Sequence, residues 1–144
     1  MPFRLALLAL LAGVAAPVAA ADPVACTAPA DLSGTPLAAW AEADGGAAEP
    51  LVPGRPVTLA MTDGAGSRSL RIANAGRYGV AADGKVWIDL VAAGEPLASV
   101  EHGHGPACSG IRKIVWFDLA AGDYRLALSK AAAMDVRLLV VRAP

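Results

Sequence analysis

The amino-acid sequence predicts an all-β fold, a single antiparallel β-sandwich of jelly-roll type with about eight strands. From Pro56 onward, apolar residues recur at every second position in short runs, which is the period of a strand with one buried face. Turn-forming Gly, Asp and Pro separate these runs, and helical spacing is absent from this part of the chain. These observations place one β-sandwich domain over residues 56–144, preceded by an irregular segment, 22–55, and a leader, 1–21.

The leader begins MPFRLALLALLAGVAAPVAAAD and has the pattern of a secretory signal peptide. Arg4 precedes an apolar run of about 12 residues, and small residues ending in Ala19-Ala20-Ala21 follow it. This run is shorter than the ~20 residues that span a bilayer. We therefore expect cleavage near Ala21, a periplasmic or secreted location, and no membrane span in the mature chain, with an uncleaved anchor as the alternative.

The charge balance argues against nucleic acid as a partner. The 144-residue chain has 12 Lys and Arg against 13 Asp and Glu, and loss of Arg4 with the leader leaves a formal charge of −2. Nucleic-acid binding needs clustered cations, and binding to an anionic membrane needs a polybasic patch. Neither is visible along the sequence, so we expect an unknown ligand or protein partner.

Residues 22–55 are rich in Ala, Pro and Gly and show no sustained period. Prolines at positions 36, 50 and 53 oppose a regular helix across this segment. Leu37 and Trp40 predict either one short turn or an extended edge, in each case with the tryptophan docked on the core.

The first two strands are expected at 56–61 and 68–73. PVTLAM alternates apolar and polar residues and stops at the turn sequence TDGAGS. RSLRIA alternates around Leu70 and Ile72 and stops at the turn sequence NAG. Both runs have the alternation of strands with one buried face.

The next two strands, 77–82 and 85–92, are expected to form a hairpin. Asp83-Gly84 separates them, and Asp-Gly is a strong signal for a two-residue hairpin turn. In KVWIDLVA the branched aliphatic residues alternate with a tryptophan and an aspartate, which predicts one buried and one polar face.

Four further strands complete the expected sandwich. Gly94-Glu95-Pro96 turns the chain into LASVEH, and Ala121-Gly122 separates KIVWFDLA from DYRLALSK. The last run, MDVRLLVV, lies close to the end of the sequence. These four strands are expected at 97–102, 113–120, 123–130 and 134–141.

Cys26 and Cys108 are the two cysteines of the chain, and we expect a disulfide between them. Export to an oxidising compartment favours pairing, and an even count leaves no odd thiol. A lipidated Cys26 fits badly because the apolar run of the leader ends about ten residues earlier. The bridge would join the mature N-terminus to the region of the histidines.

The stretch EHGHGPACSGIRK, residues 101–113, holds both histidines of the chain and is the main candidate site. Its glycines and proline predict a loop at the exit of a strand, with both imidazoles facing solvent. Loops of this kind on a rigid sandwich carry many binding sites. The candidate binding residues are His102, His104, Arg112 and Lys113, with the last two expected as solvated cations at the start of the next strand.

Two tryptophans, Trp87 and Trp116, fall in expected strands. An exposed tryptophan beside the loop would offer a stacking surface for a sugar or a peptide. Burial statistics favour core packing for both, so core packing is the expectation and the stacking surface is the alternative.

A metal site is a further hypothesis for the same stretch. In an extended segment His102 and His104 point to the same side, where two imidazoles hold Zn²⁺ or Cu²⁺ if a third ligand joins them. The third ligand would be Glu101, Asp89 or Asp118. Reduced cysteines would instead complete a Cys₂His₂ set, which a disulfide removes.

Four stretches, VWIDLV, HGHGPACSGIRK, VWFDL and LAAGDYRLAL, together resemble a group of small exported alphaproteobacterial proteins over most of residues 56–141. Members of that group have no established activity, and some are labelled homogentisate 1,2-dioxygenase. That label implies a cupin-like centre with non-haem iron. The run AGDYRLAL also resembles a strand of pre-peptidase C-terminal domains, which are jelly-roll accessory modules.

The sequence departs from the cupin pattern in two ways. Cupins follow their first H-x-H with a glutamate, whereas H-G-H here is followed by GPACSG, and a third histidine is missing. An iron centre would need His102, His104 and an aspartate on one face. We therefore predict an exported accessory or binding domain without catalytic residues, with the cupin-like dioxygenase as the alternative.

Overall fold

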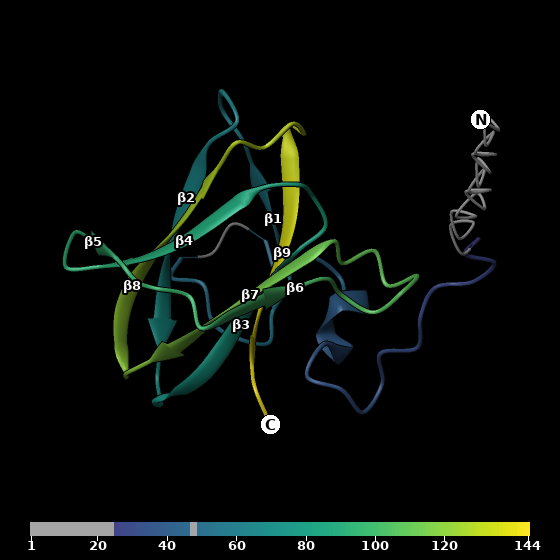
Figure 1. Ribbon diagram of the computed structural model, residues 1–144, viewed down its shortest axis with the longest axis horizontal. Helices are drawn as coiled ribbons and strands as arrows, with labels where there is room; N and C mark the ends of the chain where they lie inside the picture. The colour runs from purple at the N-terminus through teal and green to yellow at the C-terminus, as the bar shows by residue number, and fades with distance from the viewer. Residues whose placement is uncertain (1–24, 47–48) are drawn as a thin grey trace, which may run out of the picture.

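The computed structural model describes residues 25–46 and 49–144, so the expected signal peptide lies outside the described residues. The fold is all-β, as predicted, and consists of two antiparallel sheets packed into a sandwich (Figure 1). The described residues form nine strands and one short 3₁₀ helix. This helix is too short to cross a membrane, and the described part of the chain contains no helix that could do so.

The two sheets have different sizes. The five-stranded sheet has the order β1 (Val57–Ala60), β9 (Asp135–Arg142), β3 (Gly76–Ala82), β7 (Lys113–Leu119) and β6 (Glu101–Gly103). The four-stranded sheet has the order β2 (Gly66–Ile72), β8 (Gly122–Ser129), β4 (Trp87–Ala92) and β5 (Glu95–Pro96).

The expected strand at 97–102 is mostly wrong. Its last two residues belong to β6, while residues 97–100 carry the chain from the edge of one sheet to the edge of the other. The Leu97 N–H donates to Leu90 O of β4 (2.8 Å), and the Val100 N–H donates to Trp116 O of β7 (2.8 Å). A segment that crosses between sheets cannot pair along its length, although its composition is that of a strand.

The expected hairpin at Asp83-Gly84 is also wrong. β3 pairs with β7 and β9, whereas β4 pairs with β8 and β5 in the other sheet. A two-residue turn of the expected type needs positive φ at both central residues, and neither has it. Asp83 instead extends the pairing with β9, because its Oδ1 accepts the Arg137 N–H at 2.9 Å.

The main core lies between the two sheets and is built from the alternating residues that the sequence indicated. Burying a side chain such as Leu90 or Phe117 contributes roughly 1.5–3 kcal/mol each. Tyr124 lies half-buried against this core. The fully buried side chains include Leu59, Leu70, Val80, Leu90, Phe117, Leu126 and Leu138.

A second apolar cluster covers the outer face of the five-stranded sheet. The 3₁₀ helix η1 (Ala38–Ala41) brings Trp40 onto Leu139 and Val141 of β9, and Trp40 is only 8% exposed. The short-turn prediction for this tryptophan is therefore confirmed. Arg137 of β9 also holds this turn against the sheet, since its Nη2 donates to Trp40 O at 3.0 Å.

The predicted disulfide is confirmed. Cys26 and Cys108 are bonded, with their Cα atoms 5.5 Å apart and a sequence separation of 82 positions. The Ala30 N–H donates to Cys108 O at 2.9 Å, which adds a backbone contact beside the bridge. The N-terminal segment therefore runs beside the loop that follows β6 (Figure 1).

Candidate functional site

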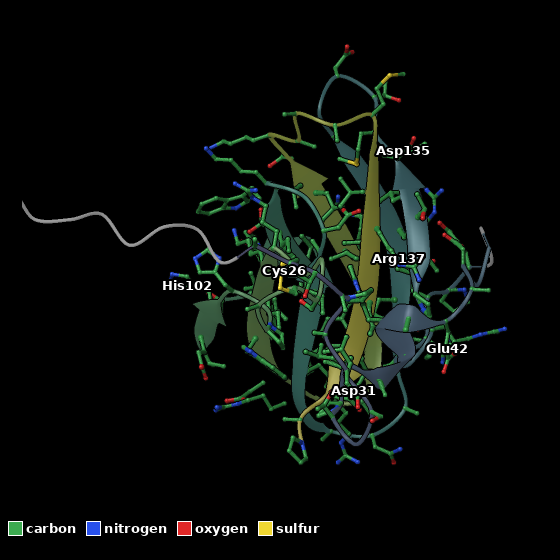
Figure 2. All side chains as sticks on the ribbon, turned by 90° about the vertical axis from the view of Figure 1, so that its right-hand side faces the viewer. Cys26, Asp31, Glu42, His102, Asp135 and Arg137 are labelled. Carbon is green, nitrogen blue, oxygen red and sulfur yellow. A yellow bond between two sulfur atoms is a disulfide. The ribbon has the colours of Figure 1, made fainter. Side chains whose placement is uncertain are left out.

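The stretch 101–113 folds as a hairpin, with β6 and β7 as its arms and residues 104–112 as its loop. His102 lies opposite Val115, and Glu101 lies opposite Trp116. Opposed residues of an antiparallel pair share a face, so His102 is on the inner face of the sheet and Glu101 is on the outer face. Both His102 and His104 are exposed, as expected. Figure 2 shows His102 at the edge of the sandwich, away from Glu42 and Arg137.

The far part of the loop is held tightly. Cys108 has a φ of +63° and carries the disulfide, and Ile111 is buried in the second cluster. A Cβ on Gly105 would collide with the side chain and carbonyl of Ile111, so this glycine is needed for close packing. Ser109 closes the turn, since its Oγ donates to Pro106 O (2.7 Å) and accepts the Ile111 N–H (3.1 Å).

His104 and Arg112 are joined across the near part of the loop. The Nδ1 of His104 lies 2.9 Å from Arg112 O, and a carbonyl oxygen only accepts, so Nδ1 carries the proton. The Arg112 N–H donates to Ala82 O at 2.8 Å, which anchors this corner on β3.

Two hollows open beside the hairpin. The first, which we name the cationic hollow, has a volume of about 270 Å³. It brings together all four candidate binding residues, His102, His104, Arg112 and Lys113. Lys85 also lines this hollow, from the segment 83–86 that crosses between the sheets. Lys85 is not among the binding residues predicted from the sequence, because a hairpin at Asp83-Gly84 was expected in place of this crossover.

The second, which we name the Trp87 hollow, has a volume of about 190 Å³ and shares His102 and Lys113 with the first. Trp87 and Asp89 of β4 lie at its four-stranded side. The rest of its lining is Ile88, Leu97, Ser99, Val115 and Phe117.

The prediction that Trp87 packs in the core is wrong, because this residue is 53% exposed at the start of β4. Its Nε1 donates to Asp89 Oδ1 at 3.1 Å, which fixes the indole. The ammonium groups of Lys113 and Lys130 lie 5.3 Å and 5.2 Å from the ring centroid, within cation–π range. Trp116, in contrast, is half-buried against the second cluster.

Lys113 is half-buried, rather than a solvated cation as expected. Its Nζ donates to Val86 O at 3.2 Å and lies over the Trp87 ring. Lys113 belongs to one sheet and Trp87 to the other, so this contact ties the two sheets together at the open side of the sandwich. Arg112 is exposed, as expected.

None of the three candidate third ligands completes a metal site with the two histidines, although Asp89 lines the Trp87 hollow together with His102. Glu101 is on the outer face of its sheet, and Asp89 accepts the Trp87 indole N–H. Asp118 accepts a hydrogen bond from Arg77 Nε at 2.9 Å, and this bond lowers the pKa of Asp118 below its usual value. Across residues 25–46 and 49–144, no three His, Cys, Asp or Glu side chains form a group that could hold a metal ion.

The disulfide also removes the Cys₂His₂ set, because neither sulfur is a thiolate. The described residues therefore do not fit a zinc, copper or iron centre built from this chain alone.

Comparison with known proteins adds no family to this geometry. No protein-family model and no curated protein matches the chain. The resemblance to exported alphaproteobacterial proteins stays a prediction, and the site is interpreted from its own residues.

Proposed function

We propose that this chain is an exported, non-catalytic binding domain that holds its ligand in the cationic hollow and the Trp87 hollow. The observation that carries this proposal is the exposed ring of Trp87, held in one orientation beside a fixed loop. Aromatic rings with an exposed face are frequent anchors of binding sites, because they offer a large contact area at a small cost in side-chain entropy. The signal-peptide pattern supports export, and the disulfide is compatible with an oxidising compartment outside the cytoplasm.

The site is organised before any ligand arrives. Lys113, Trp87 and His104 each have a fixed partner, and the loop is anchored by the disulfide. A preorganised site loses less conformational entropy on binding, so a small contact surface gives useful affinity. This favours a binding role for the corner over that of a simple connecting loop.

The side chains at this corner also favour binding over catalysis. Ser109 lies close to His104 in the sequence, yet its Oγ is used in two hydrogen bonds that shape the loop. For the dioxygenase alternative, the described residues supply His102 and His104, but no group of three His, Cys, Asp or Glu side chains among them could hold an iron ion.

Metal binding is tested separately by thermal melting with Zn²⁺ or Cu²⁺. We expect little or no rise in Tm, because two exposed imidazoles without a third ligand bind a metal weakly. A large rise that His102→Ala/His104→Ala abolishes would establish a metal site and contradict this expectation.

The binding proposal is tested by an NMR fragment screen of the mature chain, with charged and neutral ring compounds. We expect saturable shifts that centre on the Trp87 indole N–H and on the amides of 102–104 and 112–113. Trp87→Ala should abolish this binding. The matched control is Met134→Ala, which removes an apolar side chain that is 82% exposed and lines neither hollow. Hits that map elsewhere, no hits at this corner, or full binding by Trp87→Ala would contradict the proposal.

A further inference from the structure

The lysines of the chain gather at one corner, although the chain as a whole has a net charge of −1. The sequence contains three lysines, which lie far apart along it. Lys85 and Lys113 line the cationic hollow, and Lys130 lies over the Trp87 ring. With Arg112 and both histidines, they form a cluster of basic side chains that the sequence shows only in part, because Lys85 and Lys130 lie outside the stretch 101–113.

The lining of the cationic hollow contains no carboxylate, although Asp89 lines the adjacent Trp87 hollow. The Asp83 carboxylate accepts the Arg137 N–H on β9. Glu101 faces Arg77 on the outer side of the sheet. The pKa of Arg77 is raised first by its hydrogen bond to Asp118 and also by the charge of Glu101. Among the described residues, the lining of the cationic hollow therefore carries basic side chains and no carboxylate.

Lys85 and Arg112 differ in this respect from three of the arginines on the sheets. Arg68, Arg71 and Arg77 each form an ion pair with a carboxylate of the chain. Lys85 and Arg112 are exposed, and neither forms an ion pair within the described part of the chain. Unpaired cations around a hollow attract an anion and leave N–H donors for it.

From these observations we infer that the ligand is a small organic anion, a carboxylate, sulfate or phosphate attached to a ring. This inference rests on the proposed function of the same corner. The anionic group would lie in the cationic hollow between Lys85 and Arg112. The ring would contact Trp87 and the apolar lining of the second hollow, which includes Leu97 and Val115.

The geometry limits the size of this ligand. Each hollow is smaller than the ~300–1,000 Å³ of sites for drug-sized molecules, so the pair suits one ring and one anionic group. His102 and Lys113 form the wall that both hollows share, so the anionic group must be attached directly to the ring or lie close to it. Sugar acids and aromatic anions both have this chemistry.

Two matched pairs of probes test the inference and separate these two sources. Benzenesulfonate is compared with neutral benzenesulfonamide, and glucuronate is compared with neutral glucose, by NMR titration of the mature chain at low salt. We expect the anion of at least one pair to bind at this corner about tenfold more tightly than its neutral partner. Preference for benzenesulfonate would indicate an aromatic anion, and preference for glucuronate would indicate a sugar acid.

Variants then test whether the corner cations cause the preference. Lys85→Gln and Arg112→Gln should each weaken anion binding about three- to tenfold and reduce its salt dependence. Arg55→Gln is the matched control, because Arg55 is exposed and lines neither hollow. Equal binding of the anion and its neutral partner would overturn the inference, and so would Lys85→Gln and Arg112→Gln variants that behave like the control.

The failure of this inference is distinct from that of the proposed function. If fragments bind at the corner and neither anion does, the inference of an anionic ligand is wrong, but the proposed binding function is not contradicted. A corner that binds nothing in either experiment would overturn both.

Discussion

Trp40 and Trp87 both lie within cation–π range of a basic side chain, yet one is covered and the other is open. Arg137 lies 5.5 Å from the Trp40 ring centroid and also donates to the carbonyls of Trp40 and Glu42, which closes the turn over the sheet. Trp87 has Lys113 and Lys130 near its ring, and it is still 53% exposed. Lys113 also donates to a backbone carbonyl, that of Val86, so the difference lies in the apolar residues that cover Trp40, which include Leu139 and Val141. The comparison teaches that this apolar cover, more than a nearby cation, decides whether the ring is structural or available.

The loop 104–112 joins these two regions. Its far part, with Cys108 and Ile111, belongs to the covered region of Trp40. Its near part, with His104 and Arg112, lines the cationic hollow. The covered region therefore supplies the rigidity that the open region uses for binding, and changes to the two regions should have different effects.

The largest effect should come from Trp40→Ala. Removing this buried ring leaves a cavity over β9 and exposes the second cluster, and the free energy of unfolding should fall by about 3–5 kcal/mol. Chemical denaturation followed by circular dichroism measures the change. A loss below about 1 kcal/mol would show that the covered region is not structural.

Opening the disulfide should have the next largest effect. The bridge spans 82 positions, so its loss frees a long loop in the unfolded chain and should cost about 2–4 kcal/mol. Thermal melting of a Cys26→Ser/Cys108→Ser variant checks this value. The native protein should also resist alkylation without a reductant, and reactive thiols in that state would contradict the bridge.

Trp87→Ala sharpens the comparison because it should scarcely change stability. The ring is more than half exposed, so its removal should change the free energy of unfolding by no more than about 1 kcal/mol. The same denaturation experiment gives the value beside that of Trp40→Ala. If the two variants lose similar stability, the distinction between the covered and the open tryptophan is wrong.

The smallest effect should come from Asp118→Asn, which breaks the exposed pair with Arg77 on the outer face. The hydrogen bond from Arg77 lowers the pKa of Asp118 from its usual 3.8. A lowered pKa stabilises the fold above the unfolded-state pKa, and this stabilisation disappears as pH falls through the folded-state pKa. The Tm difference between native and variant protein should therefore be small at neutral pH and vanish in acid. A difference that grows in acid would contradict this sign.

Much of the fold follows from the sequence because period-two alternation identifies strands and their buried faces. This held for the runs that became β1, β2, β3, β4, β7, β8 and β9. The pattern does not say which strand pairs with which. Asp83-Gly84 has hairpin composition, yet the chain there crosses to the other sheet because β9 occupies the place beside β3. The sandwich was predictable for this reason, and its crossovers were not.

The site was predictable only in its continuous part. His102, His104, Arg112 and Lys113 lie within one short stretch, and the hairpin brings them to one hollow. Lys85 reaches that hollow through a crossover between the sheets. The same topology leaves Trp87 at the open side of the sandwich, and neither position follows from local sequence.

The central claim is that a ligand binds between Trp87 and the β6–β7 loop, and intermolecular NOEs test it most directly. The probe is whichever of benzenesulfonate and glucuronate binds more tightly to the mature chain. We predict NOEs from the ring protons of the probe to the Trp87 indole and to His102, with none to Trp40. NOEs that place the probe on another face, with none to Trp87, would contradict the claim.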